Sequence, residues 1–410
     1  MGGRRMSGRE YRLYSSLPGL EGALKWARID LCALQSNYAT LCRALSQGAA
    51  RSPRVIAVVK ADAYGHGAPE CVRALLRSGC DFFAVSSIEE AMTVRAVCDE
   101  CSVDADVMIL GYTDPSHARL LSDKRLIQSL LSEQYAERLN DHAARAGVCV
   151  RSHVAVNTGM NRIGFEARSE EEIKESARAI LRVSAYSALD VCGMFTHLAR
   201  ADEEGDGAIA TRVQMERYRS LRGSIEALGL TIPFHHVCNS AAALREDAEA
   251  FDGVRLGILL YGACPALHRG LVLRPVMRLE ARILHVHKLL AGECVGYGGE
   301  FCAETEREIA VIGIGYADGW LRAYGGASVL VNTESGVKEA LVVGRICMDQ
   351  CMLDVTGIGA CVGDTVSLFG EEPRRLAMLS QRASSIDYEV LCAVSSRVLR
   401  VYEGGTAAEA

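Results

Sequence analysis

The amino-acid sequence predicts an α/β protein, a (β/α)8 TIM-like barrel followed by a mainly β C-terminal domain. Short apolar runs alternate with helical stretches from about residue 54 to residue 260, a rhythm typical of parallel strands joined by helices. After about residue 265 the helical stretches give way to strand-like runs punctuated by glycines, which indicates a second, β-rich domain. The chain has 410 residues, enough for one large domain and a smaller one.

Eight apolar runs in the first part of the chain have the length of barrel strands. Helices are indicated between them by capping signals, such as Ser169 with Glu172, and by an N-cap at Asp30 before an apolar stripe. A doubly wound parallel sheet would show the same local rhythm and stays an alternative. The eight runs are residues 54–59, 82–85, 107–110, 126–129, 150–156, 191–195, 233–237 and 254–258.

The change of pattern predicts where the domains begin and end. We expect a flexible N-terminal extension over residues 1–25, the barrel over 26–265, the β domain over 266–402 and a tail over 403–410. The expected strands of the β domain are Glu280–Leu290, Glu308–Ile314, Ala340–Ile346 and Thr365–Phe369.

The composition argues against several classes of partner. A net charge of −6 and a pI near 6.0 do not favour binding to nucleic acid or to an anionic membrane. No apolar run reaches the ~18 residues of a membrane helix, and the N-terminus lacks the apolar core of a secretory signal. We therefore expect a cytoplasmic protein without nucleic-acid or membrane partners.

The 16 cysteines do not suggest a metal site. Most lie in apolar segments, for example Cys192, Cys238 and Cys392, where we expect buried free thiols that behave as small hydrophobic groups. Cys98 and Cys101 form one CxxC motif without a second pair at zinc-finger spacing. No metal ligand is predicted.

Chemically active residues follow several of the predicted strands. Lys60 ends the first run, Arg162 lies just past the fifth and His197 directly follows the sixth. In a (β/α)8 barrel the carboxyl ends of the strands form the active site, so these side chains are expected to converge. Taken singly, a lysine at a strand end is more often solvated, and a histidine there can be an ordinary barrel residue.

The last two strands are followed by groups suited to a phosphate. Asn239 and Ser240 come after the seventh strand, and the eighth leads into Gly257 and Ile258. Their side chains and backbone N–H groups can bind a phosphate without any lysine. A lysine facing such a site across the barrel mouth suggests pyridoxal phosphate held as a Schiff base on Lys60.

The chain resembles the alanine racemases from Trp26 to about Tyr402. The most specific segments are "AVVKADAYGHG" (57–67) and "GIGYADGW" (313–320), and the order and spacing of all the segments agree with the family. The others are "WARIDLCAL" (26–34), "NTGMNRIGF" (157–165), "MFTHLARADE" (194–203), "HHVCNSAA" (235–242), "VRLGILLYG" (254–262), "LRPVM" (273–277), "VGRICMDQ" (343–350) and "IDYEVLC" (386–392).

The resemblance implies a pyridoxal-phosphate-dependent isomerase that interconverts L- and D-alanine and supplies D-alanine for peptidoglycan. It further implies that Lys60 is the cofactor lysine and the base on one face of the cofactor. Tyr316 would be the second base, supplied by the partner subunit of a homodimer with shared active sites. Two bases on opposite faces are what racemisation at Cα requires.

The resemblance also implies the roles of the remaining site residues. Arg255 would face the pyridine nitrogen with His236 behind it, and His197 would lie near the ring. Arg162 would reach the cofactor's phenolic oxygen and the substrate carboxylate, which the backbone N–H of Met348 also meets. The residues expected around the phosphate are Tyr64, Asn239, Ser240, Gly257, Ile258 and Tyr388.

Three other functions compete with this interpretation. A non-catalytic pyridoxal-phosphate-binding protein would have the barrel without a second domain. A decarboxylase of the same architecture would lack the "GYADGW" and "RICMDQ" segments. A racemase of serine or of larger amino acids stays open, because excluding a hydroxymethyl group by size is worth only ~1–3 kcal/mol. Asp202 and Arg345 match the family's substrate entrance, where we expect surface ion pairs with a gating role.

One departure from the family concerns Arg162. Many alanine racemases have a carbamylated lysine and an aspartate where this chain has Ala155 and Asn157. We expect Arg162 to be a buried cation without its usual anionic neighbour, which is costly. The sequence therefore predicts a chloride ion bound by Arg162 and the amide of Asn157. Ordered water, with the cofactor's phenolate as the only counter-charge, is the alternative.

Overall fold

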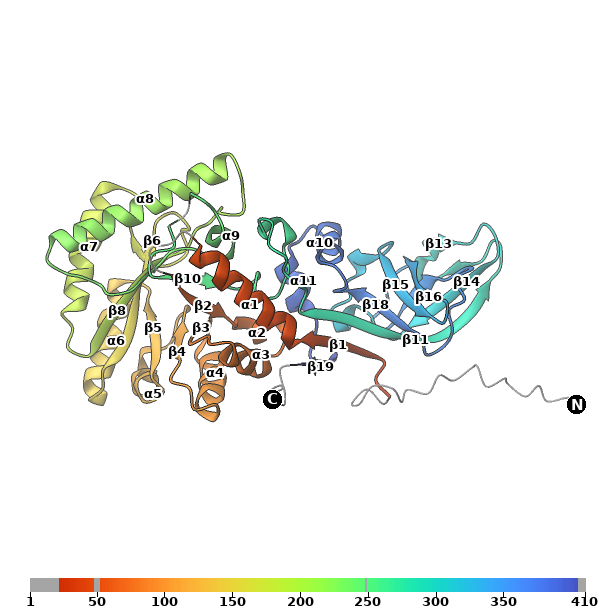
Figure 1. Ribbon diagram of the computed structural model, residues 1–410, viewed down its shortest axis with the longest axis horizontal. Coiled ribbons are helices and arrows are strands. Elements are labelled where there is room, and N and C mark those ends of the chain that lie inside the picture. The colour runs from red at the N-terminus through yellow and green to blue at the C-terminus, as the bar shows by residue number, and fades with distance from the viewer. Residues whose placement is uncertain (1–21, 48–51, 248, 405–410) are drawn as a thin grey trace, which may run out of the picture.

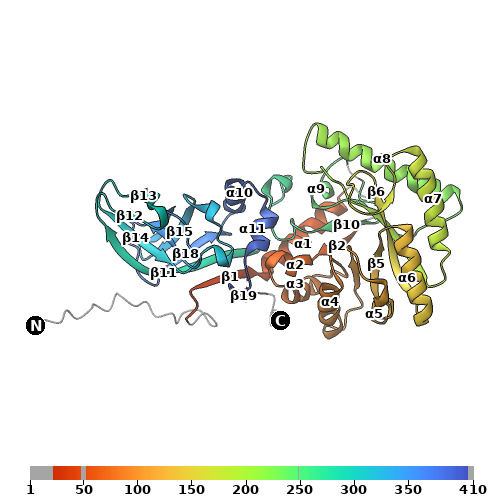
Figure 2. The same cartoon turned by 180° about the vertical axis from the view of Figure 1, so that it is seen from behind.

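The computed structural model describes residues 22–47, 52–247 and 249–404. They form a barrel and a β domain that lie side by side along the longest axis of the molecule (Figures 1 and 2). Most of the predicted N-terminal extension and residues 405–410 of the predicted tail lie outside the described residues.

Eight parallel strands close into the predicted barrel. β2 and β10 pair in register, with Arg255 opposite Ile56, and the pairing of β5 with β6 completes the ring. The eight predicted runs are confirmed, because each overlaps one strand. The strands are β2 (Arg54–Val58), β3 (Phe82–Val85), β4 (Asp106–Ile109), β5 (Leu126–Leu130), β6 (Val150–Asn157), β8 (Leu189–Thr196), β9 (His235–His236) and β10 (Gly253–Leu256), with the short β7 (Phe165–Glu166) beside β6.

Helices connect the barrel strands, and the predicted caps are present. The side chain of Asp30 accepts from the N–H of Ala33, and that of Ser169 accepts from the N–H of Glu172. Such caps satisfy N–H groups that have no partner within the helix. The helices are α1 (Leu31–Ser46), α3 (Ala68–Arg77), α4 (Ile88–Glu100), α5 (Ala118–Asp123), α6 (Glu133–Ala146), α7 (Glu170–Ser184), α8 (Asp206–Ala227) and α9 (Ser240–Ala243), with a short turn, α2 (Lys60–Gly65), after β2.

The β domain is built on one eight-stranded sheet. Its order is β14-β17-β16-β15-β18-β11-β1-β19, and β14 also pairs with β11. The strands are β11 (Met277–Leu289), β14 (Arg307–Ile312), β15 (Ser328–Thr333), β16 (Gly336–Val343), β17 (Cys351–Asp354), β18 (Thr365–Phe369), β1 (Lys25–Asp30) and β19 (Leu399–Glu403). The hairpin β12 (Cys294–Val295) and β13 (Phe301–Cys302) and the helices α10 (Pro373–Arg382) and α11 (Asp387–Ala393) complete it.

The first strand departs from the predicted barrel range. β1 pairs antiparallel with β11 and parallel with β19, so Lys25–Asp30 belongs to the sheet of the β domain. The physical reason is burial: Trp26 and Ile29 are fully buried there, and the Trp26 Nε1–H donates to the Glu280 carboxylate at 2.6 Å. The remaining domain boundaries stay predictions.

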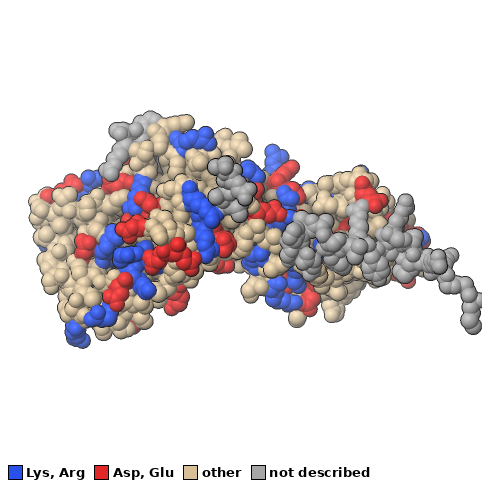
Figure 3. Space-filling view, turned by 60° about the horizontal axis from the view of Figure 1, so that its bottom comes forward, with Lys and Arg blue, Asp and Glu red and all other residues tan. Residues whose placement is uncertain are grey.

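The described surface carries charges of both signs. On the face shown in Figure 3, Lys and Arg side chains are interspersed with Asp and Glu side chains over the barrel. Within the described part of the chain, no helix is both long enough and apolar enough to cross a bilayer.

Candidate active site

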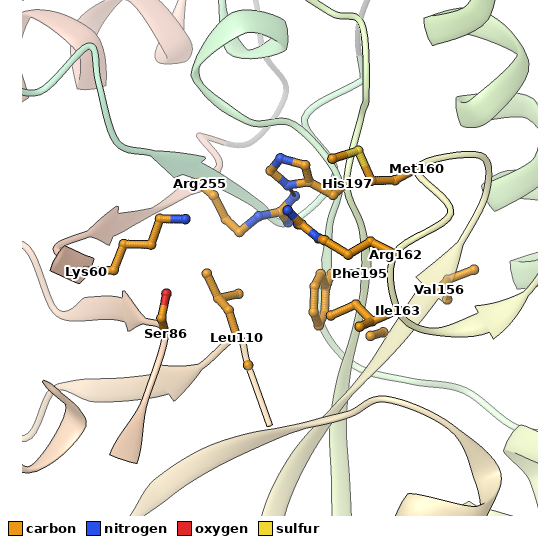
Figure 4. Close-up of a pocket in the computed structure, with 12 residues that line it drawn as sticks. Lys60, Ser86, Leu110, Val156, Met160, Arg162, Ile163, Phe195, His197 and Arg255 are labelled. Atoms are coloured by element: carbon orange, nitrogen blue, oxygen red, sulfur yellow. Dashed lines mark hydrogen bonds between the residues drawn. The ribbon is translucent and has the colours of Figure 1, made fainter. Parts of the chain in front are cut away.

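Two adjoining cavities lie at the carboxyl ends of the barrel strands. The inner cavity has a volume of about 140 Å³ and the outer cavity about 290 Å³. Lys60, His197 and Arg255 line both, and Figure 4 shows the Lys60 side chain pointing toward Arg255 across the outer cavity. Nine predicted cofactor residues line the inner cavity: Lys60, Tyr64, His197, Asn239, Ser240, Arg255, Gly257, Ile258 and Tyr388.

A left-handed turn sets the position of Lys60. Residues 61–64 have φ between 51° and 55°, a region that side chains other than glycine disfavour. The Ala61 N–H donates to the Glu90 carboxylate at 2.6 Å, and the Ala68 N–H donates to the Asp62 carboxylate at 2.7 Å. Two carboxylates from the chain thus hold a strained turn directly behind the lysine, as is common at functional sites.

The surroundings of Lys60 favour its neutral form. Its pKa lies below the ordinary value because of burial first and the positive charge of Arg162 second, while Glu90 and Cys392 oppose this change. A lysine that loses its proton more easily is a better nucleophile toward a carbonyl group and a better base.

Arg255 is a buried cation whose terminal nitrogens, Nη1 and Nη2, both have acceptors. It is 3% exposed, and Nη1 donates to Nδ1 and to the carbonyl of His236 at 2.7 and 2.8 Å. Nη2 donates to the carbonyls of Thr196 and Val237 at 2.6 and 2.9 Å. Burial lowers the pKa of Arg255 to about 10, so the guanidinium is charged at neutral pH.

A second histidine lies behind the arginine. Burial, and then the charge of Arg255, hold the pKa of His236 well below its ordinary value. The neutral ring accepts from Arg255 at Nδ1, so Nε2 carries the proton and faces Nδ1 of His153 at 3.0 Å. Burial likewise lowers the pKa of His153 to about 3. His236 therefore lies behind Arg255, as predicted, and it is itself held by a neutral histidine.

His197 lines both cavities as a neutral imidazole. Burial lowers its pKa to about 3, and the charges of Arg255, Arg162 and Lys60 act in the same direction. Its Nδ1 lies 3.4 Å from Nη2 of Arg255. A neutral histidine at this place packs against a ring without adding charge.

The predicted phosphate end is closely packed. The Gly257 N–H donates to Oγ of Ser240 at 2.9 Å, and a Cβ at Gly257 would lie 2.3 Å from Oη of Tyr64. The Tyr64 ring packs between Tyr261 and Tyr388, with centroids 5.0 and 5.9 Å apart. Because the Tyr64 ring is fixed by its two neighbours, position 257 has room only for glycine.

Asn239 caps the turn that carries Ser240. Its Oδ1 accepts from the Ala242 N–H and its Nδ2 donates to the Leu198 carbonyl, both at 3.1 Å. The Asn239 side chain thus positions the lining of the inner cavity.

The predicted second base lies apart from these cavities. Tyr316 and Met348 line neither cavity and are 40% and 53% exposed. The two residues lie on adjoining loops, because the Tyr316 N–H donates to the Cys347 carbonyl and the Ala317 N–H to the Met348 carbonyl, both at 3.0 Å. The structure brings Tyr316 and Met348 together but does not bring them to Lys60 of their own chain.

A buried carboxylate holds the Tyr316 loop. Asp318 is fully buried, and its Oδ2 accepts from the Gly315 N–H at 3.1 Å and from Lys25 Nζ at 2.8 Å. Arg397 Nε lies 3.3 Å from the other carboxylate oxygen. The loop is therefore anchored on both sides of its tyrosine.

Arg162 differs from the prediction. It lines the outer cavity, and Figure 4 shows it directed toward His197, but the residue is exposed rather than buried. The loop after β6 lies over the open mouth of the cavity, where Ile163 is also 37% exposed. Water screens the guanidinium there, so the expected cost of a buried charge is absent in the single chain.

The predicted role of Asn157 in anion binding is contradicted. Its Nδ2 donates to the Glu166 carboxylate at 2.7 Å and to Asn161 Oδ1 at 3.2 Å, and its Oδ1 accepts from backbone N–H groups. Both polar atoms of the Asn157 amide therefore already have hydrogen-bond partners within the protein. The Glu166 carboxylate would also repel an anion beside it. Ala155, by contrast, lines the outer cavity.

The sequence-based prediction missed part of the cavity lining. Ser86 and Leu110 line the outer cavity, directly after the carboxyl ends of β3 and β4, so the strand-end rule was a sufficient signal for both. Phe195 also lines it and stacks on His236 with ring centroids 4.9 Å apart. The Phe195 side chain faces the barrel interior because the strands close into a barrel. The local sequence pattern around Phe195 does not show this.

The cysteines are less uniformly buried than predicted. Cys238 is buried, but Cys192 is half-buried and Cys392, on the short helix α11, is exposed. Cys98 and Cys101 are not joined, whereas Cys294 and Cys302 form a disulfide. The described residues contain no group of three or more His, Cys, Asp or Glu side chains placed to hold a metal ion.

Comparison with known proteins identifies the family. Residues 29–265 match the model of the alanine racemase N-terminal domain, and residues 276–402 match that of the C-terminal domain. The chain belongs to the alanine racemase family. It is therefore an isomerase of a pyridoxal-phosphate-dependent family, and the predicted resemblance and fold are confirmed.

Relatives of the chain cover nearly its whole length. Alanine racemase 1 of Clostridium acetobutylicum is 36% identical over 92% of this chain and 95% of its own. The solved alanine racemase of Clostridium difficile 630 is 33% identical with a TM-score of 0.83, covering 93% of this chain and 96% of its own. Alanine racemase from Bartonella henselae, solved with covalently bound pyridoxal phosphate, is 27% identical with a TM-score of 0.80 and covers 93% and 100%.

The inner cavity of the racemase fits the family's cofactor. Lys60 offers a nitrogen whose pKa is lowered, Arg255 offers a satisfied cation, and the Gly257 backbone meets Ser240 Oγ where the predicted phosphate would bind. The backbone of Gly257 and Oγ of Ser240 form the cradle for the predicted phosphate. Because Gly257 has no side chain, this cradle stays open.

Replacing Gly257 by alanine tests this cradle. The new Cβ would overlap Oη of Tyr64, which is held between two other rings. We expect Gly257→Ala to raise the dissociation constant for pyridoxal phosphate about tenfold or more, as overpacking costs ~1–3 kcal/mol. Titration of the apoprotein with the cofactor, followed by absorbance, measures this.

A matched control for this test lies in α8. A Cβ at Gly223 would meet nothing within 4 Å, so Gly223→Ala should bind the cofactor as the unchanged chain does. Equal affinity in Gly257→Ala and Gly223→Ala, with both folded, would contradict the proposed cradle.

Proposed function

We propose that this chain interconverts L- and D-alanine by two-base catalysis at the carboxyl end of its barrel, with pyridoxal phosphate bound to Lys60. The observation that carries the proposal is the convergence of nine predicted cofactor residues on one cavity of about 140 Å³. Tyr64, Ser240, Gly257, Ile258 and Tyr388 would surround the phosphate, together with Asn239, which caps the neighbouring turn.

The two bases are Lys60 and Tyr316. When bound, pyridoxal phosphate supplies an electron-withdrawing ring that stabilises negative charge on the substrate Cα. Nζ of Lys60 removes or returns a proton on one face of that carbon, and the phenolic oxygen of Tyr316 does so on the other. The lowered pKa of Lys60 supports its role, because its neutral form is the one that accepts a proton.

Arg162, Arg255 and Met348 orient the reacting groups. Arg255 would face the pyridine nitrogen, where a permanent positive charge disfavours protonation of that nitrogen and so limits side reactions such as transamination. Arg162 and the backbone N–H of Met348 would bind the substrate carboxylate. His197, neutral in the cavity wall, would pack near the ring.

The active unit would be a homodimer with shared sites. Tyr316 and Met348 are exposed in their own chain and line neither cavity, while the mouth of the outer cavity is open beside Arg162. A two-fold symmetric dimer would bring the loop of each chain over the cavity of the other. The product, D-alanine, would serve peptidoglycan precursors, and we place the enzyme with that synthesis in the cytoplasm.

Borohydride reduction of the holoenzyme tests the role of Lys60. We expect an absorbance band of the bound cofactor, racemisation of L-alanine, and a label found by peptide mapping on Lys60. Lys60→Ala should lose the band, while exchange of an exposed lysine, Lys174→Ala, should keep it. A label on another lysine would refute the assignment.

The same assay separates the competing functions. Equal or faster turnover of L-serine would favour a racemase of broader specificity, release of CO₂ would indicate a decarboxylase, and a bound cofactor without turnover would indicate a binding protein.

Mixing two inactive variants tests the shared site. Lys60→Ala and Tyr316→Ala subunits that re-associate at random should recover about a quarter of the original activity, because half of the dimers then contain one intact site of two. The double variant Lys60→Ala/Tyr316→Ala, mixed with Lys60→Ala, should recover none. A fully active monomer in sedimentation experiments would exclude the shared site.

We also propose that chloride binds beside Arg162, in the space that Ala155 leaves in the outer cavity. The short side chain of Ala155 and the cation beside it support the proposal, and Asn157 takes no part because its amide is committed. In the dimer, the partner's loops would exclude water from this mouth and strengthen the attraction.

Removing chloride tests this site. Activity should fall in chloride-free buffer and return with chloride or bromide, and a bromide soak should give an anomalous peak beside Arg162. Ala155→Lys, which restores the family's lysine, should make the activity independent of halide. Activity indifferent to halide, without a peak, would leave ordered water in the site.

A further inference from the structure

We propose that Cys294 and Cys302 form a reversible thiol–disulfide pair that controls the loop carrying Met348 and, through it, Tyr316. The two cysteines are exposed and face each other across the hairpin β12–β13, where they form a disulfide. This proposal rests on the proposed function only for its effect on catalysis.

The hairpin has few backbone bonds of its own beyond the cysteine pair. β12 and β13 pair over two residues each, two more backbone bonds join Gly292 and Glu293 to Ala303 next to the cysteines, and a hairpin of this size is marginal in water without other contacts. Its turn contains Gly296, Gly298 and Gly299 at φ of 78°, 76° and 58°, and glycines gain the most conformational freedom when a constraint is removed. Reduction therefore frees the turn between the two sulfur atoms.

The hairpin packs directly against the segment that leads to Met348. A Cβ at Gly298 would lie 3.0 Å from Cζ of Arg345, and a Cβ at Gly344 would lie 2.8 Å from the Val295 carbonyl. Arg345 also forms an ion pair with Glu300 of the same turn, at 2.5 Å. The hairpin thus lies against both the backbone and the side chain of the segment 344–345.

Buried apolar contacts connect the same two segments. Val295, Val343 and Met352 belong to one small hydrophobic cluster, against which Phe301 packs. Val343 and Met352 flank the loop that contains Met348 on both sides. An ordered hairpin therefore fixes the two ends of this loop.

The loop that contains Met348 is hydrogen-bonded to the backbone at Tyr316, the proposed second base. The Cys347 carbonyl accepts from the Tyr316 N–H at 3.0 Å, and the Met348 carbonyl accepts from the Ala317 N–H at 3.0 Å. Contacts run without a gap from the cysteine pair to the backbone of Tyr316. The oxidised form holds the Met348 loop against the backbone of Tyr316 and Ala317, and in the reduced form the Met348 loop moves while Asp318 still anchors the Tyr316 loop.

Glutathione supplies the exchange chemistry. One cysteine thiolate attacks a sulfur of glutathione disulfide and releases one glutathione thiolate, and the second cysteine thiolate then displaces the other glutathione. The two cysteines lose two electrons and two protons, and two glutathione thiols are formed. Excess reduced glutathione reverses both steps.

Redox titration of the full-length holoenzyme tests the pair. Samples equilibrated in buffers of different glutathione ratio are alkylated and mapped by mass spectrometry, which should show a bridged peptide with Cys294 and Cys302 on the oxidised side only. The KM for L-alanine should be about threefold higher in the reduced enzyme, as expected when the competent loop is populated about a third of the time. kcat should change less.

Two pairs of variants make the assignment specific. Cys294→Ser/Cys302→Ser should keep the reduced KM in every buffer. Cys98→Ser/Cys101→Ser, which removes cysteines that are not joined, should respond to glutathione as the unchanged enzyme does.

Amide hydrogen exchange provides a measurement independent of racemase activity. Residues 294–302 and 343–350 should exchange faster after reduction, even in a preparation that does not racemise alanine, so failure of the proposed function and failure of this proposal are distinguishable. A bridged peptide that never forms overturns the proposal. Equal exchange and equal KM in the bridged and reduced forms also overturn it.

Discussion

Arg255 carries a positive charge into the interior of the barrel, and the surrounding groups are arranged to satisfy it. Backbone carbonyls from the ends of β8 and β9 and one ring nitrogen accept its protons. Nδ1 of His236 can accept from Arg255 only because the His236 ring is neutral. Nε2 of the same ring is hydrogen-bonded to Nδ1 of His153. An unpaired buried guanidinium would cost several kcal/mol, so the strand ends, the two histidines and the cavity wall form one interdependent unit.

Lys60, opposite Arg255, is positioned by the conformation of the backbone that follows it. The left-handed turn at residues 61–64 is unfavourable for side chains, yet the carboxylates of Glu90 and Asp62 bind its backbone and the following helix. These anions lie behind the lysine. Burial first, and the cation Arg162 on the cavity side second, lower the pKa of Lys60, although Glu90 opposes this change. The fold thus combines a rigid attachment with an electrostatic field that favours the neutral amine.

The β domain contributes to the site through two kinds of contact. Helix α11 brings Tyr388 onto Tyr64 in the same chain, which completes the predicted phosphate end. The Tyr316 loop instead faces outward, anchored by the buried carboxylate of Asp318 and by Lys25 of β1. Strand β1, at the N-terminal end of the described chain, therefore contacts the loop of the proposed second base through Lys25 and Asp318.

Local signals in the sequence determined the eight barrel strands, the position of Lys60 at the end of the first, and the strand-end residues of the inner cavity, whereas Tyr64, Arg255 and Tyr388 were expected only from the resemblance to the family. Apolar runs, caps and motif spacing are local properties, and the strand-end rule converts them into a site. Four features were decided only by tertiary structure: the pairing of β1 with β11, the exposure of Arg162, the bond between Asn157 and Glu166, and the packing of the Cys294–Cys302 hairpin on Arg345. Each depends on which segments meet in space and how much water remains between them, and the pattern of a single segment does not contain that information.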